Sequence, residues 1–324
     1  MSVFIIRRLL QAAIVVLAMA TIVFFGVFLV GDPVWMFVDV EMTQEDIEAV
    51  TRALGLDRPM WEQYLRFLQS AFTGDLGRSF VFGEPATQII LQRMPATLEL
   101  AGTAVFLSIT LGVPLGLYAG LRPKSFISRT IMTGSIFGFS LPNFWVGIML
   151  IMVFAVILGW TPSTGRGETA TFLGITSSLF TLNGLSHLIL PAFNLALTNI
   201  SLVIRLTRAG VMEAIHQDYI KFARAKGLSG NRIVGVHLMK NIMIPVVTVI
   251  GLEAGSLIAF AVVTETVFAW PGMGRLLIQS IQQLDRPLIV AYLMLIVFLF
   301  VIINLIVDIC YSLLDPRVRL GDRT

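Results

Sequence analysis

Charged side chains are scarce in this chain. Only 13% of its 324 residues are Asp, Glu, Lys or Arg, and 56% are hydrophobic. A soluble domain carries about 25% charged residues. Most of the chain therefore does not face water, and the composition predicts an integral membrane protein.

Cysteine is nearly absent, and so are long runs of like charge. The single cysteine, Cys310, lies in an apolar segment, which excludes an internal disulfide. We interpret it as a small, packed apolar side chain. No five consecutive like charges occur and the formal net charge is only +3, so nucleic-acid binding has little support.

Residue patterns that carry chemistry are missing as well. A phosphate-binding loop needs Gly-Lys followed by Ser or Thr, and the sequence contains no Gly-Lys pair. His187, His216 and His237 are scattered, and no paired carboxylates, His/Cys cluster or nucleophile elbow is in register. We therefore expect no catalytic, cofactor-binding or metal-binding residues, and any energy from ATP must arrive through a partner.

The sequence does contain long apolar runs. A bilayer core takes about 20 residues of apolar helix. Six such runs occur, which predicts an all-α membrane protein with six transmembrane helices: 9–30, 98–121, roughly 131–158, roughly 185–206, 242–267 and 288–314. Pro142 lies inside the third run, and we expect that helix to bend or to begin there.

The first run needs a comparison with a secretory signal. Arg7 and Arg8 resemble the basic start of a signal peptide, and residues 18–20 (Ala-Met-Ala) resemble a cleavage site. The apolar run nevertheless continues through Val30, whereas a signal peptide has an apolar core of about 7–15 residues. We interpret the run as a retained helix.

The positions of Lys and Arg predict the orientation. With the N-terminus inside, the inner segments hold 15 of the 23 basic residues, and five of the other eight lie in the long segment 31–97. Long segments translocate largely regardless of charge. We therefore expect a multi-pass membrane protein with both termini in the cytoplasm.

The outer segments have soluble patterning. In 31–97, Thr43 to Asp46 resemble a capping box that opens a helix, and Trp61, Tyr64, Leu65 and Leu68 recur at helical spacing. This segment is either a cap on the pore mouth, which we favour, or a docking surface for an external partner. Between 268 and 287, Trp270 fits an interfacial anchor.

The inner segment 207–241 is the most informative part of the chain. It reads as a helix, a glycine turn at Gly227, and a second helix that Ser229 or Asn231 can cap. It lacks the broad Leu/Phe/Trp face of a membrane-surface helix. Its small residues permit close approach to a groove on another protein.

Polar residues inside the apolar runs are candidates for function. Glu253 lies midway along the fifth run beside Gly251 and Gly255, and we hypothesise that it lines the pore and selects for a substrate amine or cation. Glu99 is expected at the interface, and Asp308 near the inner end. Asn143, Asn194 and Asn199 either line the pore or make hydrogen bonds between helices.

The chain resembles a known family at residues spread over nearly its whole length. The motifs include Leu54-Gly55-Leu56-Asp57, Gly74-Asp75-Leu76-Gly77-Arg78-Ser79, Pro95-Ala96-Thr97-Leu98-Glu99-Leu100, Pro142-Asn143-Phe144-Trp145, Glu265 to Gly272, and also Gly31-Asp32-Pro33 and Leu314-Asp315-Pro316-Arg317. Together they are similar to the B-type permease subunit of the dipeptide/oligopeptide/nickel ABC importers.

The same resemblance identifies 207–241 as the cytoplasmic coupling loop of that family. Lys221 and Phe222 depart from the general pattern of an acid and an alanine, while Ala223, Gly227 and Pro245 match it. The departure is typical of the peptide/nickel group. The residues expected to couple to an ATPase are Asp218, Lys221, Phe222, Ala223, Arg224, Ala225, Lys226, Gly227, Leu228 and Pro245.

The resemblance implies a type I ABC-importer membrane domain that forms half of a pore in a bacterial or archaeal cytoplasmic (inner) membrane. The expected partners are a similar second permease, two cytoplasmic ATPase subunits that bind ATP and Mg, and a periplasmic or lipid-anchored solute-binding protein. The expected segments are a first helix with its short N-terminus (1–30), a periplasmic segment (31–97), a five-helix core (98–314) and a cytoplasmic tail (315–324). Members of the group carry peptides, nickel chelates, glutathione-like compounds and short sugars.

Three other classes of membrane protein fit the sequence less well. A stand-alone secondary transporter tends to show internal repeats and charge relays, and neither is evident here. A membrane enzyme would need a constellation of catalytic residues. A purely structural or signalling membrane protein would not need the segment 207–241.

Overall fold

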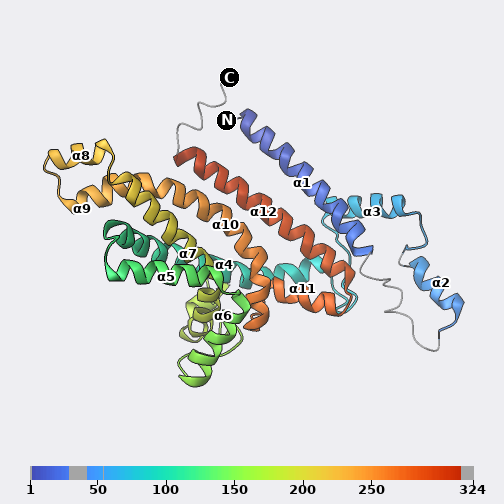
Figure 1. Ribbon diagram of the computed structural model, residues 1–324. Coiled ribbons are helices and arrows are strands. Elements are labelled where there is room, and N and C mark those ends of the chain that lie inside the picture. The colour runs from blue at the N-terminus through green and yellow to red at the C-terminus, as the bar shows by residue number, and fades with distance from the viewer. Residues whose placement is uncertain (1, 29–41, 54, 315–324) are drawn as a thin grey trace. The chain divides into compact units, whose positions relative to one another are not determined.

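The computed structural model describes residues 2–28, 42–53 and 55–314, and side chains at 10, 11, 13–26, 42–53 and 55–307. It is almost entirely helical (Figure 1). The elements, in chain order, are α1 (Ser2–Phe28), α2 (Gln44–Ala53), α3 (Met60–Thr73), α4 (Ala86–Leu121), α5 (Phe126–Ser140), α6 (Asn143–Leu150), the π-helix η2 (Ile151–Ile157), β1 (Ala170–Phe172), β2 (Ile175–Ser177), the 3-10 helix η3 (Ser178–Phe180), α7 (Leu182–Ala214), α8 (Asp218–Ala225), α9 (Gly230–Arg232), the π-helix η4 (Ile233–Leu238), α10 (Met239–Val267), α11 (Met273–Gln282) and α12 (Arg286–Leu314).

Each of the six apolar runs forms helix. Within the residues that the structure describes, four stretches of helix are long and apolar enough to cross a membrane: α4, α7, α12 and the continuous stretch from α9 to α10. The first run forms α1, in which the described stretch Ala13–Gly26 is an apolar helix. The structure thus confirms an all-α membrane fold. Cys310, Asp308, Gly31-Asp32-Pro33 and the tail from Asp315 lie outside the side chains that it describes.

The third run is two helices rather than one. α5 ends at Ser140, and α6 begins at Asn143 with its axis turned by 111°. Leu141 and Pro142 are both extended, because a residue before proline is pushed out of the α region and proline lacks the N–H that would continue the ladder. The break at Pro142 is as expected, but the run begins earlier, at Phe126, and makes a sharp corner.

The chain divides into two compact units, residues 1–95 with 271–301 and residues 96–270 with 302–324. In the first unit, Val23 of α1 packs with Ile289 of α12, and Tyr64 of α3 donates to or accepts from Thr21 at 2.7 Å. α2 begins with the expected capping box: the Thr43 N–H donates to Asp46 Oδ2 at 3.0 Å, and the Asp46 N–H donates to Thr43 Oγ1 at 3.4 Å. Thr43 Oγ1 also donates to Asp46 Oδ2 at 2.7 Å. These bonds hold the pKa of Asp46 below its usual value.

Asp285 fixes an outer corner of this first unit. Its carboxylate is fully buried and accepts hydrogen bonds from the Ser79 hydroxyl and the Phe80 N–H. The φ of Gly77 is +87°. A Cβ added at Gly77 would lie 3.4 Å from Pro287 Cβ, so the backbone passes close to the start of α12 here. The motif Gly-Asp-Leu-Gly-Arg-Ser is therefore a turn that binds the start of α12.

In the second unit, α7 lies at the centre and packs against α5, α6 and α10. α4 approaches it through Gly112, Gly116 and Gly120, which we call the glycine row. A Cβ added at any of the three would lie 2.5–2.7 Å from atoms of α7. Small residues at four-residue spacing let two helix backbones meet closely, as in many membrane proteins.

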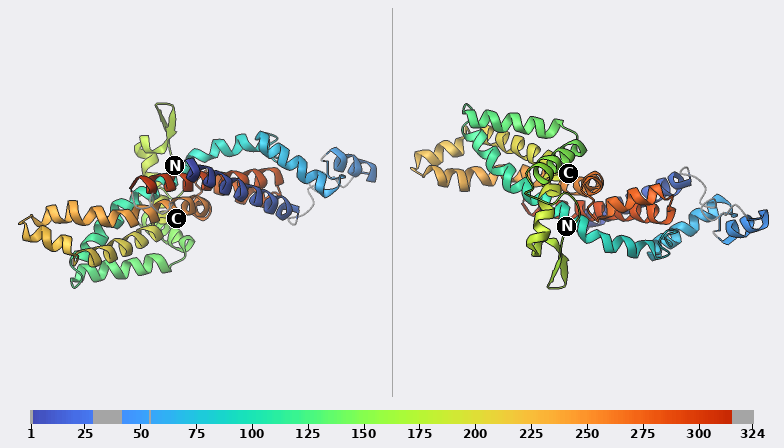
Figure 2. Two further views of the ribbon diagram at one scale, coloured as in Figure 1. Left: turned by 90° about the horizontal axis from the view of Figure 1, so that it is seen from above. Right: turned by 90° about the horizontal axis from the view of Figure 1, so that it is seen from below.

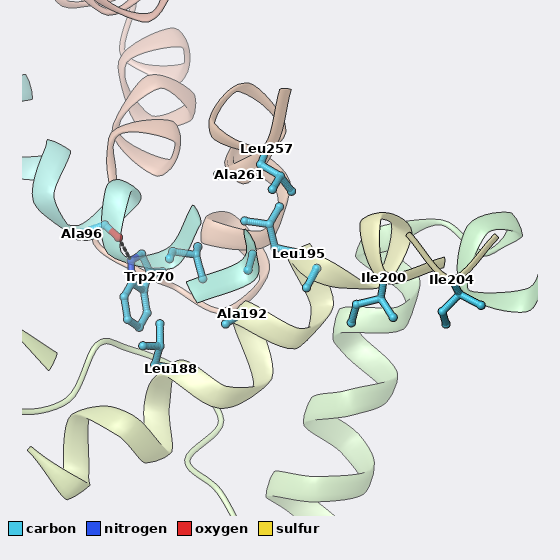
Figure 3. Close-up of a cluster of buried hydrophobic side chains, with 12 residues drawn as sticks. Ala96, Leu188, Ala192, Leu195, Ile200, Ile204, Leu257, Ala261 and Trp270 are labelled. Carbon is cyan, nitrogen blue, oxygen red and sulfur yellow. Dashed lines mark hydrogen bonds between the residues drawn. The ribbon is translucent and has the colours of Figure 1, made fainter. Parts of the chain in front are cut away.

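Trp270 closes the apolar core of the second unit (Figure 3). Its ring is fully buried among side chains that include Leu188, Ala192 and Leu195, and its Nε1 donates to the Ala96 carbonyl at 2.9 Å. An interfacial anchor contacts lipid headgroups, which this buried ring cannot do, so that expectation was wrong. The indole is buried because a carbonyl of α4 satisfies its only donor.

The connection from η2 to α7 carries a small hairpin. β1 and β2 pair antiparallel, and the hairpin projects away from the helices of its unit (Figure 2). Leu173 at its tip is 87% exposed.

Candidate functional site

The segment between α7 and α10, where the coupling loop is expected, consists of α8, α9 and η4 (Figure 1). α8 and α9 lie together at one end of the α7–α10 pair. α8 begins at Asp218 and ends at Ala225, so the expected helix–turn–helix is confirmed for this part of the chain. The second helix continues through η4 into α10 with no break, and Pro245 lies inside α10.

Gly227 ends α8 in the way that the sequence indicated. Its φ is +73°, in the left-handed region that glycine adopts without strain. The Gly227 N–H donates to the Arg224 carbonyl at 2.9 Å, and the Leu228 N–H donates to the Ala223 carbonyl at 3.2 Å. This pair of bonds is the Schellman motif, which fixes the direction in which the chain leaves a helix.

One face of α8 is anchored. Ile220 and Ala223, one turn apart, are buried in a cluster that includes Val211 of α7 and Ile242 of α10, and Leu228 packs against it. The anchored face holds α8 against the ends of the two long helices. A force on α8 therefore reaches α7 and α10 through packed side chains.

The other face of α8 is exposed and both aromatic and basic. Phe222 is 62% exposed, and the Lys226 ammonium lies 4.6 Å from the centre of its ring. Lys221 donates to Asp218 at 2.9 Å, and this bond holds the pKa of Asp218 below its usual value. Aromatic residues and Arg are enriched in protein interfaces, so the exposed Phe222 and Arg224 favour a binding face over a merely solvated one.

The cap of the second helix differs from the expectation in one detail. Ser229 occupies the N-cap position in an extended conformation, but its side chain makes no capping hydrogen bond, and Asn231 lies inside α9. The Ser229 carbonyl instead accepts from the Ile233 N–H at 3.0 Å. Backbone geometry alone starts this helix.

A second feature lies deeper in the same unit. A pocket of about 10 Å³ is lined by residues of α4, α7 and α10: Val105, Ser108, Asn199, Leu202, Val203, Val249, Ile250 and Glu253. Two of the four candidate pore residues, Glu253 and Asn199, thus line the same pocket. Asn143 lies elsewhere, with its Oδ1 accepting from Thr198 at 3.3 Å. Asn194 donates to Thr264 at 3.1 Å, so both of these amides bond between helices.

Glu99 has a partner that the sequence did not reveal. Its side chain is only 4% exposed and lies 2.5 Å from Arg166 Nη2, 67 residues away along the chain. The Ser178 N–H and hydroxyl donate to the other carboxylate oxygen. Glu99 is thus an anchor for the hairpin connection, and no local pattern could have found Arg166.

Sequence reasoning also missed residues that act through packing. Ser108 of the pocket looks like any hydroxyl in an apolar helix, and only its position against α7 and α10 distinguishes it. The spacing of the glycine row could have been recognised. Among the residues that the structure describes, no group of three or more His, Cys, Asp or Glu is arranged to hold a metal ion.

Comparison with known proteins places these features in a family. Residues 112–320 match the model of the binding-protein-dependent transport system inner membrane component, and residues 1–101 match the model of its N-terminal region. The di/tripeptide transport system permease protein DppB of Pseudomonas aeruginosa is 39% identical over 318 residues, which cover 91% of this chain and 95% of that protein. The dipeptide permease DppB of Escherichia coli is 36% identical over 98% of both chains. The oligopeptide permease AppB of Bacillus subtilis is 39% identical over 98% of this chain and 100% of its own.

Solved structures agree on the fold. An inward-facing conformation of the MetNI methionine ABC transporter matches with a TM-score of 0.53 and 18% identity, over 70% of this chain and 97% of that chain. The expected type I importer membrane fold is therefore confirmed. The chain belongs to the family of binding-protein-dependent transport system inner membrane components.

Proposed function

We propose that this permease forms half of the translocation pore of an ATP-driven importer for peptides or related small solutes such as nickel chelates. The relatives described above are named for transport of dipeptides, tripeptides and oligopeptides. The observation that carries the proposal is the geometry of the coupling loop. A short helix is anchored on one face to α7 and α10 and presents Phe222 and basic side chains on the other.

The coupling loop is the proposed docking site for a cytoplasmic ATPase subunit. Phe222 would enter a pocket of that subunit, while Lys221, Arg224 and Lys226 lie around it. Pro245, the other expected coupling residue, lies inside α10. Movement of α8 would pass to α7 and α10 through Ile220, Ala223 and Leu228. In this arrangement the ATPases hydrolyse ATP, and the permease converts their closure into a change of the pore.

Family membership supports the rest of the proposed assembly. A second permease completes the pore, a second ATPase docks on it, and a periplasmic or lipid-anchored protein delivers the solute. The protein lies in the cytoplasmic membrane with both termini inside, as the positions of Lys and Arg predict. The segments 1–30, 31–97, 98–314 and 315–324 then alternate between the membrane and its two sides as expected above.

The test exploits two glycines of the coupling loop. Gly227→Pro forces a φ near −65° on a residue at +73° and removes the N–H that donates to Arg224. Gly230→Pro is the matched control, because Gly230 is the first residue of α9, where proline is favoured, and a Cβ there meets nothing within 4 Å. Ser229 before it is already extended, as a residue preceding proline prefers.

Both variants are purified with their partner subunits, and ATP hydrolysis and dipeptide uptake are measured in proteoliposomes. We expect Gly227→Pro to lose the ATPase subunits, or to retain hydrolysis and lose uptake, while Gly230→Pro stays within about twofold of wild type, a difference of about 0.4 kcal/mol. Equal uptake by the Gly227→Pro transporter and the wild type would overturn the coupling role. Ion-driven uptake by the chain alone would show a secondary transporter.

A further inference from the structure

Glu253 stands out among the carboxylates of the apolar helices. It lies 14 residues from either end of α10, which is about 21 Å of helix in each direction. Glu99 is paired with Arg166, and Glu265 accepts from Thr97 at 2.6 Å. Within the described residues, Glu253 has no hydrogen bond and no ion pair.

The apolar surroundings of Glu253 raise the free energy of a carboxylate that has no hydrogen-bond or ion-pair partner. Five of the eight pocket residues are apolar: Val105, Leu202, Val203, Val249 and Ile250. An ionised carboxylate in an apolar environment needs a positive partner or hydrogen-bond donors to offset its desolvation. Ionisable groups in the middle of a membrane span mark ligand or ion paths by default.

The two other polar residues of the pocket offer a specific set of acceptors. Asn199 is only 7% exposed, and its amide makes no hydrogen bond to the described residues. Ser108 donates its hydroxyl proton to the Ala104 carbonyl at 2.7 Å, so toward the pocket it can only accept. Glu253, Asn199 and Ser108 therefore bring a carboxylate, an amide oxygen and a hydroxyl oxygen to one small space.

We propose that this pocket binds the ammonium group of a substrate during its passage. An alkylammonium has three N–H donors and one positive charge, which match three acceptors of which one is negative. A volume of about 10 Å³ holds roughly one water-sized group, so it admits the –NH3⁺ head while the rest of the ligand stays outside. The occupant is then a solute with a free amine, as a peptide with an unblocked N-terminus is.

This inference rests on the proposed transport function, and the first experiment separates the two. The whole transporter is reconstituted in proteoliposomes with wild-type permease, Glu253→Gln, Ser108→Ala or the control Glu168→Gln. Glu168 is an exposed carboxylate of the hairpin connection. Uptake of labelled dialanine is measured together with ATP hydrolysis.

Glu253→Gln removes one charge-assisted hydrogen bond, and we expect dialanine uptake to fall by a factor of about 10 to 100. Ser108→Ala should lose about threefold to tenfold, and Glu168→Gln should match wild type. Stimulated ATP hydrolysis should persist in all of them. If the wild-type transporter takes up dialanine and the Glu253→Gln variant does so equally well, the inference about the pocket is overturned and the proposed transport function stands. If the wild-type transporter takes up no peptide, the proposed transport of peptides is overturned instead.

A second measurement bypasses the solute-binding protein, which makes its own selection. Glu253 in the purified transporter is labelled with a hydrophobic carbodiimide and quantified by mass spectrometry. Dialanine should slow the labelling, whereas N-acetyl-dialanine at equal concentration should not. Equal protection by both peptides contradicts an ammonium site. Equal protection by potassium chloride would assign the pocket to small inorganic cations and overturn the proposal.

Discussion

At the scale of single residues, the ion pair between Glu99 and Arg166 is the interaction whose loss should cost most. The Glu99 side chain is 4% exposed and that of Arg166 is 17% exposed. Removing one partner of a buried pair leaves an uncompensated charge, which costs about 3 kcal/mol or more. We expect Arg166→Met to lower the unfolding temperature of the purified permease in detergent by several degrees.

The control is another Arg–Glu ion pair that is more exposed to solvent. Arg58, which precedes α3, and Glu62, in the first turn of α3, lie 2.5 Å apart with side chains 39% and 31% exposed, and Arg58 lowers the pKa of Glu62. An exposed pair contributes about 0–1 kcal/mol. Arg58→Met should therefore leave the unfolding temperature almost unchanged. Equal shifts for the two variants would mean that the burial of Glu99 does not govern its energy.

Residues differ in how far the sequence alone predicted them. Gly227 and Asp46 were recognised correctly because a helix cap depends on neighbours within four residues. Trp270 was misread because its hydrogen-bond acceptor is the carbonyl of Ala96, 174 residues away. Arg166 was overlooked for the same reason. Local conformation is encoded locally, whereas partners across a fold are set by packing of distant helices.

At the scale of the helices, close packing of α4 on α7 depends on the glycine row. A Cβ at Gly116 would lie 2.7 Å from the Ile204 carbonyl oxygen and 2.7 Å from Thr207 Cβ. Backbone atoms cannot turn away, so the two helices would have to separate. Overpacking of this kind costs about 1–3 kcal/mol. We expect Gly116→Ala to destabilise the permease, as measured by unfolding in detergent.

Gly102 provides a matched control on the same helix. A Cβ there meets nothing within 4 Å. Alanine is about 0.5–1 kcal/mol better than glycine within a helix. Gly102→Ala should therefore leave the permease as stable or stabilise it, and the two Gly→Ala changes should have opposite signs. Similar destabilisation by both would refute close packing at Gly116.

Hydropathy predicted the existence of the helices better than their ends. α4 begins at Ala86, whereas the apolar run begins at residue 98, and α7 extends to Ala214, whereas its run ends near 206. Ile89 and Ile90 in the first extension and Val211 in the second are buried, so a helix can continue beyond the apolar run wherever other elements cover its apolar side chains. The pocket residues Glu253 and Asn199 were predicted individually, but their meeting with Ser108 required the packing of three helices.

At the scale of the whole molecule, the corner at Pro142 decides how many times the chain crosses the membrane. If α5 and α6 with η2 together make one crossing, the total is six and both termini lie on the same side. If the 111° bend makes them a re-entrant loop, the total is five and the termini lie on opposite sides. Charge favours six, because the connection between α4 and α5 carries Arg122 and Lys124, while residues 159–181 carry only Arg166.

Cysteine labelling distinguishes the two topologies. With Cys310 replaced by alanine, single cysteines are placed at Lys124, in the exposed α4–α5 connection, and at Leu173, at the exposed hairpin tip. A membrane-impermeant maleimide should label Leu173→Cys on intact cells and Lys124→Cys only after permeabilisation. If both were labelled from the same side, the bent pair would be re-entrant, and the six-span topology with both termini inside would be wrong. If they were labelled from opposite sides but in the reverse order, six crossings would stand and the orientation derived from Lys and Arg would be inverted.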